Sequence, residues 1–168
     1  MPNTRKIRPC RRNQGFTLLE VLIALLVLSI GLLGIAGMQA YGLQNNHQSY
    51  LRSQAMLIAY DMADRMRANP AGVSSYVMAS NDTSSDPGCI TTGCTPAQLA
   101  TYDKWDWKTN YVTNTKLLPV GSATVTDNAN STYTIVVTWS ERTGSAISGQ
   151  STTDASSQKS ITLVFRPL

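Results

Sequence analysis

One carboxylate, Glu20, stands at the head of the longest apolar run in the chain. From Val21 to Met38 every residue but one is apolar or glycine. A carboxylate inside a membrane segment costs about 3 kcal/mol at the centre and less near an interface. The simplest explanation is a capping box, in which Thr17 caps a helix and the acid lies three residues later. That explanation leaves the abrupt junction between Gly15 and Phe16 unexplained.

Few other side chains are suited to catalysis or metal binding. The chain has one histidine, His47, which excludes mechanisms that need two imidazoles and sites with several histidine ligands. It holds two glutamates, so few carboxylates remain for paired acid–base chemistry. It also lacks a G-x-S-x-G elbow, a phosphate-binding glycine loop and any His/Cys metal spacing. We therefore expect no enzyme, no cofactor and no metal site, and we expect His47 to be solvated or packed.

An aromatic and basic segment follows Thr95-Pro96, where a threonine cap, a proline at the first position and a glutamine three residues after the cap predict a helix start. The segment carries Leu99, Tyr102, Lys104, Trp105, Trp107, Lys108 and Tyr111. Such a set could stack on sugars or, with its lysines, on single-stranded nucleic acid. Asp103 and Asp106 offset the lysine charges, however, and aromatic residues at helical spacing usually pack inside a protein. We favour packing onto a sheet.

The basic character of the chain is confined to its first residues. The net charge of +4 and the isoelectric point of about 9.1 would ordinarily suggest an acidic partner such as nucleic acid or a membrane surface. Five of the 14 basic residues lie within residues 1–15, which contain no acid, so 9 basic and 10 acidic residues remain beyond them. Residues 16–168 thus carry a net charge of −1. We expect no nucleic-acid partner.

The basic leader and the apolar run together predict a membrane anchor. A helix from Phe16 to Met38 spans roughly 33 Å, which matches the hydrocarbon core of a bilayer. The upstream positive charges would hold the N-terminus on the cytoplasmic side of the membrane, in a single-pass topology. An ordinary secretory signal peptide, cut near residues 36–40, is the alternative. Its apolar region should run only about 7–15 residues, which is shorter than this one.

Six adjacent residues at the junction resemble a known processing signal. The sequence Gly15-Phe16-Thr-Leu-Leu-Glu20, behind a basic leader and ahead of an apolar helix, is similar to the class III signal of type IV prepilins and pseudopilins. The resemblance implies that a prepilin peptidase and methyltransferase cuts after Gly15 and N-methylates Phe16, the new N-terminus. It also implies that Glu20 neutralises the amino terminus of a neighbouring subunit. Pairing removes most of the cost of burying a carboxylate and an ammonium.

The helix is expected to continue to residue 69, since no proline interrupts residues 39–69. Apolar side chains recur on one helix face at spacings of four and three residues, and they are Leu51, Ala55, Ile58, Met62 and Met66. Asn69-Pro70 ends the run. The segment Asp64-Arg-Met-Arg-Ala-Asn-Pro70, after such a helix, resembles the PilV group of minor pilins.

A polar stretch, residues 72–96, reads as a loop and contains Cys89 and Cys94. A translocated domain meets an oxidising compartment, so a disulfide between these two cysteines is the default. A zinc site needs about four ligands, and no others lie nearby. Cys10 lies in the leader and is lost on cleavage, which leaves an even number of cysteines.

Beyond residue 119 the hydrophobic pattern changes to period two. It predicts strands at residues 122–126, around 133–139 and near 161–165, with a polar loop at 143–160. Three strands in series predict an antiparallel meander packed on the long helix. The fold class is therefore α+β, and the resemblance implies the type IV pilin fold. The expected divisions are a cleaved leader (1–15), a transmembrane and assembly helix (16–38), an amphipathic helix (39–69), a loop region with a short helix and a cysteine clip (70–121) and an antiparallel sheet (122–168).

The resemblance implies a minor pilin that sits in the inner membrane before assembly and in a surface pilus afterwards. By similarity to the PilV group it would join other minor pilins and the major pilin in a complex that primes assembly at the tip. There it would support a tip adhesin, cell adhesion and twitching motility. Two departures from major pilins favour a minor subunit: no proline lies between Phe16 and Asn69, and the cysteine pair lies mid-chain.

Three alternatives stay open. A pseudopilin of a type II secretion system shares every N-terminal feature described above. A DNA-uptake pilin would need a basic surface, which a net charge of −1 beyond residue 15 does not favour. A membrane-anchored periplasmic enzyme would need a nucleophile and a base, and no such pair can be named.

Overall fold

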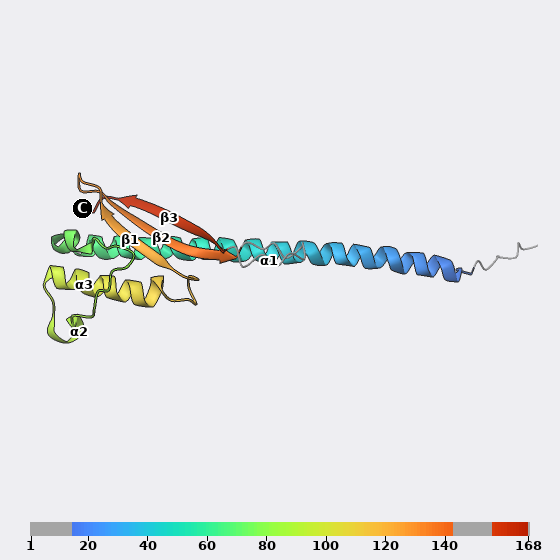
Figure 1. The fold of residues 1–168 in the computed structure, drawn as a ribbon, viewed down its shortest axis with the longest axis horizontal. Coiled ribbons are helices and arrows are strands. Elements are labelled where there is room, and N and C mark those ends of the chain that lie inside the picture. Colours follow the sequence, from blue (N-terminus) through green and yellow to red (C-terminus); the bar gives the residue numbers. More distant parts are fainter. Residues whose placement is uncertain (1–14, 143–155, 168) are drawn as a thin grey trace, which may run out of the picture. The chain divides into compact units, whose positions relative to one another are not determined.

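The computed structural model describes residues 15–142 and 156–167. It divides into two units, Met1–Leu43 and Gln44–Leu168, each of which is described by itself. Figure 1 labels the helices and strands. In chain order the elements are α1 (Leu18–Ala68), the 3₁₀ helix η1 (Pro70–Tyr76), α2 (Cys89–Thr92), α3 (Pro96–Trp107), the π-helix η2 (Lys108–Val112), β1 (Ser122–Asp127), β2 (Tyr133–Arg142) and β3 (Ser156–Phe165).

In the first unit, residues 18–43 of α1 are helical without a break, and none of them is buried. Thr17 caps the helix, because its hydroxyl accepts a hydrogen bond from the Glu20 N–H at 3.3 Å and its carbonyl accepts from the same group at 3.1 Å. By length and composition α1 is the one helix in the described residues that could cross a membrane, with a mean hydropathy of 2.7 over its most apolar 18 residues. The predicted helix start is confirmed.

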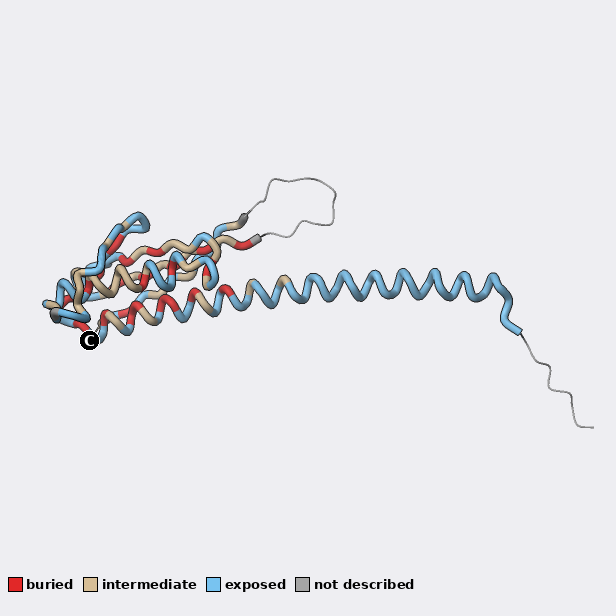
Figure 2. Tube along the Cα trace, turned by 90° about the horizontal axis from the view of Figure 1, so that it is seen from below, coloured by how far each residue is buried: buried red, intermediate tan, exposed pale blue. Residues whose placement is uncertain are grey.

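In the second unit, the rest of α1 supplies one face of the core. Its buried residues are Leu51, Ala55, Ile58, Ala59, Met62, Ala63 and Met66. These are the five residues of the predicted stripe and two further alanines, whose small side chains allow close packing. Figure 2 shows buried residues in this part of the helix and exposed ones along residues 15–43. Figure 1 shows the sheet and α3 alongside the same segment.

The sheet is the predicted antiparallel meander, with strand order β1-β2-β3. Its inward residues alternate along β2, and Tyr133, Ile135, Val137 and Trp139 are all buried. Ile135 pairs with Val125 on β1 and with Leu163 on β3, so the register brings apolar side chains together across all three strands. The outer edge of β1 is covered by Met78, which exchanges two backbone hydrogen bonds of 3.0 Å with Val125.

Trp107 fixes α3 against α1. It is fully buried, and its indole N–H donates to the Ile58 carbonyl at 2.9 Å. Tyr102 and Trp105 are half-buried, with ring centroids 5.8 Å apart, while Tyr111 lies partly exposed. Trp107 belongs to one buried core with sheet residues such as Val125 and Ile135, and its indole N–H adds a hydrogen bond to α1 that the sequence did not predict.

Two expected loops are shorter than the sequence suggests. Residues 72–76 belong to η1 and residues 89–92 form α2, both inside the expected loop 72–96. β3 begins at Ser156, so residues 156–160 are strand and not loop, while residues 143–155 lie outside the described residues. The polar start of β3 has little strand propensity of its own. It pairs because the long β2 offers partners for it, from Thr138 opposite Ser160 onward.

The Trp107 hydrogen bond predicts that replacing Trp107 destabilises the fold more than replacing Trp105. Trp107→Phe keeps most of the buried ring but leaves the Ile58 carbonyl without its indole donor. We expect it to lower the free energy of unfolding by about 1–3 kcal/mol. The measurement is urea unfolding of the detergent-solubilised chain, followed by far-ultraviolet circular dichroism. Trp105→Phe is the matched control and should cost less than half as much, and an equal loss in both variants would contradict the assignment.

Candidate functional site

The junction at Gly15 and Phe16 is not explained by packing among the residues that the structure describes. A Cβ added to Gly15 would meet nothing within 4 Å, so no contact in the described residues demands a glycine there. Phe16 is 81% exposed, although it is one of the two phenylalanines in the chain. Contacts among the described residues therefore do not explain the identity of either residue.

Glu20 carries a carboxylate that the structure leaves without a partner. Within residues 15–142 and 156–167 its side chain makes no hydrogen bond and no ion pair. The capping bond at this helix start comes from the Thr17 hydroxyl, and the return bond from Glu20 that would complete a capping box is not formed. The acid gains some stabilisation from the helix N-terminus, where negative charge is favoured. Capping therefore does not account for its position ahead of an apolar run.

The apolar surface beyond Glu20 is far larger than a soluble protein leaves exposed. Residues 18–43 are all helical, and most of their leucine, isoleucine and valine side chains are at least half exposed. Gly31 and Gly34 leave gaps in this apolar surface, although the helix continues through both residues. A Cβ added to either glycine would meet nothing within 4 Å. Glycine costs about 1 kcal/mol in a helix relative to alanine, and no contact in the described chain offsets that cost.

Arg65 is the centre of an ion-pair network in the second unit. It contacts Asp61 at 2.8 Å, Asp106 at 2.8 Å and Asp103 at 3.4 Å, and its guanidinium lies 5.6 Å from the ring centroid of Tyr111. Burial alone would lower the pKa of Arg65, but its hydrogen bonds and charge contacts with Asp106 and Asp61 raise it above the ordinary value. The network ties α3 to α1.

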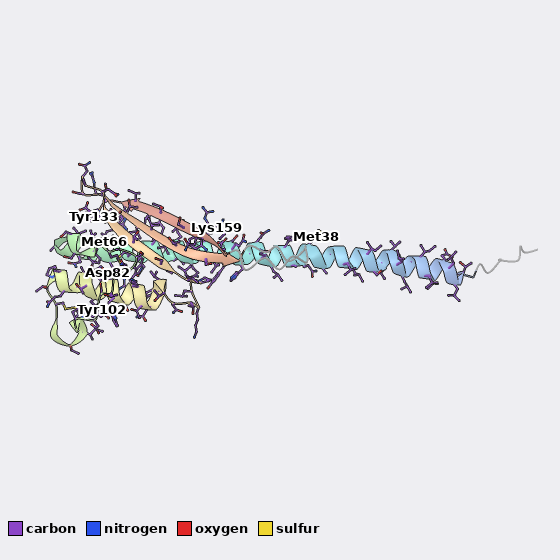
Figure 3. The ribbon with its side chains drawn as sticks, viewed as in Figure 1. Met38, Met66, Asp82, Tyr102, Tyr133 and Lys159 are labelled. Carbon is purple, nitrogen blue, oxygen red and sulfur yellow. A yellow bond between two sulfur atoms is a disulfide. The ribbon has the colours of Figure 1, made fainter. Side chains whose placement is uncertain are left out.

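Lys104 of α3 and Lys108, the first residue of η2, both contact the loop that contains Asp82. Lys104 lies 4.0 Å from the carboxylate of Asp82, and Lys108 donates to the backbone carbonyls of Ser80, at 2.9 Å, and of Asp82. Figure 3 labels Asp82 beside α3. Burial would raise the pKa of Asp82, but hydrogen bonds from Ser84 and the charges of the two lysines lower it. The lysines thus hold a loop and are not displayed for a ligand.

The end of α1 is locked to η1 and α3 by Asn69 and Tyr76, both of them buried. The Asn69 amide donates to the Pro96 carbonyl at 2.8 Å and to the Tyr76 hydroxyl at 3.3 Å, while that hydroxyl donates to the Asp103 carboxylate. A Cβ on Gly72 would lie 2.4 Å from the Pro96 carbonyl oxygen, so glycine is needed there. The segment from Asp64 to Pro70 therefore serves the packing of this unit.

The disulfide lies in the same region. Cys89 and Cys94 are bonded, as the sequence predicts, and they clip the short helix α2 just before α3. His47 is exposed on α1, and no group of three or more His, Cys, Asp or Glu side chains in the described residues is placed to hold a metal ion. The Arg65 network was not predicted, because Asp103 and Asp106 lie 38 and 41 positions from Arg65 and carry no local signal of this pairing.

Two protein-family models match adjacent segments of the chain. The model described as "Prokaryotic N-terminal methylation motif" matches residues 10–36, and the model described as "Type IV pilin Tt1218" matches residues 37–105. The first covers the junction and Glu20. The second covers the rest of α1, the Asp64–Pro70 segment, the disulfide and most of α3. No curated protein and no solved structure gives a significant match.

The Tyr76 environment predicts a loss of stability at alkaline pH. Burial, together with its hydrogen bond to Asp103, raises the pKa of Tyr76 above its ordinary value of about 10. The unfolded chain therefore releases this proton first, so the stabilisation is complete below pH 10 and is lost as the pH rises above it. Relative to Tyr76→Phe, the wild-type free energy of unfolding should fall by about 1.4 kcal/mol for each pH unit above 10.

Urea unfolding at pH values from 8 to 11.5 measures this difference. Tyr102→Phe is the control, because the hydroxyl of Tyr102 makes no hydrogen bond in the described residues, and it should keep the wild-type slope. Identical alkaline slopes for wild type and Tyr76→Phe would contradict the assignment.

Proposed function

We propose that the chain is a minor pilin of a type IV pilus, in the type IV pilin family taken broadly to include the pseudopilins. The matches to a methylation-motif model over residues 10–36 and to a type IV pilin model over residues 37–105 support this proposal. The observation that carries the proposal is the junction of Gly15, Phe16 and Glu20. These residues fall inside the matched methylation motif, and no contact among residues 15–142 and 156–167 explains them. The family is structural, and we assign the chain a structural role in filament assembly.

The first step that we propose is processing at the inner membrane. The methylation motif implies a prepilin peptidase, and the apolar helix implies anchoring in the membrane before assembly. We place the cut after Gly15, where an absent side chain leaves room for the peptidase, and we place the methyl group on the amino group of Phe16. Cleavage also removes five positive charges, which would otherwise resist withdrawal of the helix from the membrane.

The second step is insertion of the apolar helix among the helices of neighbouring pilins. There the unpartnered Glu20 carboxylate would pair with the ammonium group of the N-terminal Phe16 of a neighbour. A buried carboxylate without its cation costs about 3–5 kcal/mol, so the pair favours one register between neighbouring subunits. Exposed glycines such as Gly31 and Gly34 would let helices approach closely.

Three features support a minor subunit related to the PilV group. The helix runs from Leu18 to Ala68 with no proline, the disulfide lies before α3, and the Asp64–Pro70 segment forms the lock described above. A PilV-like subunit would act with other minor pilins in a complex that primes assembly at the tip. In that place it would support an adhesin, adhesion and twitching motility.

A pseudopilin role in a type II secretion system is the nearest alternative, because it uses the same processing and the same helix. The second family model describes a type IV pilin, and this match favours a role in a pilus over a role in secretion. A role in DNA uptake is not supported by charge, since residues 16–168 carry a net charge of −1.

The proposal predicts that Glu20 acts after processing. Glu20→Ala and Glu20→Gln should yield the same mature N-terminus as wild type, N-methylated Phe16, by mass spectrometry. Their amount in sheared filaments should nevertheless fall at least tenfold, because the neighbour's ammonium loses its buried partner. Glu20→Asp retains the charge and is the matched control, which should recover part of the incorporation.

Two results would contradict this mechanism. One is wild-type incorporation of Glu20→Gln, which would show that the charge is not needed. The other is a mature wild-type chain that begins near Gln39 or at Met1, which would remove the proposed processing site itself.

A further inference from the structure

A polar pocket of about 490 Å³ lies in the second unit, between the first turns of its α1 segment and one end of the sheet. Its volume falls within the range of about 300–1,000 Å³ that small-molecule sites occupy. Lys159, labelled in Figure 3, belongs to β3 at the end of the sheet where this strand begins. No step of the proposed assembly mechanism uses this pocket.

The strand register and the helix period bring the lining side chains together. Trp139 on β2 is directly opposite Lys159 on β3, and Glu141 follows two residues later on the same face of β2. From α1, Gln48 and Arg52 are one turn apart and line the same pocket, together with the preceding Asn45.

The pocket combines a buried acid with two exposed cations. Glu141 is only 8% exposed, and its carboxylate accepts a hydrogen bond from the Trp139 indole N–H at 2.9 Å. Arg52 and Lys159 are exposed, and within the described residues neither makes an ion pair. A carboxylate side chain therefore lines the pocket together with Arg52 and Lys159, neither of which is paired with an acid in the described residues.

This lining selects a ligand with one negative charge and several hydroxyl groups. The lining is polar except for Trp139, which is 3% exposed and has no free face for stacking, so apolar and aromatic ligands gain little. The two cations attract a carboxylate. The buried Glu141 carboxylate repels a strongly charged anion and instead accepts hydrogen bonds from hydroxyl groups.

We propose that this pocket binds an acidic sugar of the hexuronate class. The sugar carboxylate lies between Arg52 and Lys159, its hydroxyl groups donate to Glu141, and the amides of Asn45 and Gln48 pair with the remaining ring oxygens. This inference concerns the second unit alone and does not depend on whether the chain enters a filament.

Calorimetric titration of the full chain in detergent micelles tests the proposal, with D-galacturonate as the probe. D-galactose supplies the hydroxyl groups without the charge, and acetate supplies the charge without the hydroxyl groups. Galacturonate should bind at least tenfold more tightly than either compound. The absence of galacturonate binding, or equal binding of acetate, would overturn the proposal.

Variants assign the binding to this pocket. Arg52→Gln and Lys159→Gln should each weaken galacturonate binding at least fivefold, while Lys116→Gln, which removes an exposed lysine outside the pocket, should leave it unchanged. Glu141→Gln keeps an acceptor for the Trp139 indole and should lower the preference for galacturonate over acetate at least threefold. Equal losses in Lys116→Gln and Arg52→Gln would show binding through charge in general and would contradict the site.

Discussion

A helix that is apolar on every side cannot remain in contact with water, and the rest of this structure has to accommodate that constraint. Residues 18–43 are exposed in the described part of their unit, so lipid or other helices would have to cover them. Lipid accommodates leucine and isoleucine but disfavours a charge at depth, so in the proposed function Glu20 would lie near the membrane surface until a cation pairs with it. The proposed membrane anchor and the proposed surface for helix packing are thus formed by the same residues.

The second unit has a hydrophobic core of its own. Its core is built on the stripe that includes Leu51, Ile58 and Met62, and Trp107 joins α3 to the same helix through a backbone carbonyl. Polar contacts complete the attachment, with Arg65 facing three aspartates and Tyr76 linking η1 to α3. The Cys89–Cys94 disulfide restrains the connection before α3. Each of these contacts lies within the second unit, residues 44–168.

Sequence periodicity predicted the elements well where a single local signal dominated. The apolar stripe of α1, the cap at Thr95 and the alternation in β2 each follow from neighbouring residues, and the structure confirms them. The features that the sequence did not predict depend on residues that are far apart in the chain. Residues 156–160 form strand because β2 pairs with them, and Asp103 contacts Arg65 and Tyr76 across 38 and 27 positions. The pocket around Glu141 could not be predicted either, since only the register brings Lys159 opposite Trp139.

Deletion of the gene, followed by counts of surface pili and an assay of secreted proteins in the same cells, tests the central claim most directly. If the chain is a minor pilin that primes filament assembly, surface pili should fall sharply, secretion should continue, and the wild-type gene should restore the pili. Normal numbers of pili, together with exported proteins retained in the periplasm, would contradict the account and indicate a pseudopilin of a type II secretion system.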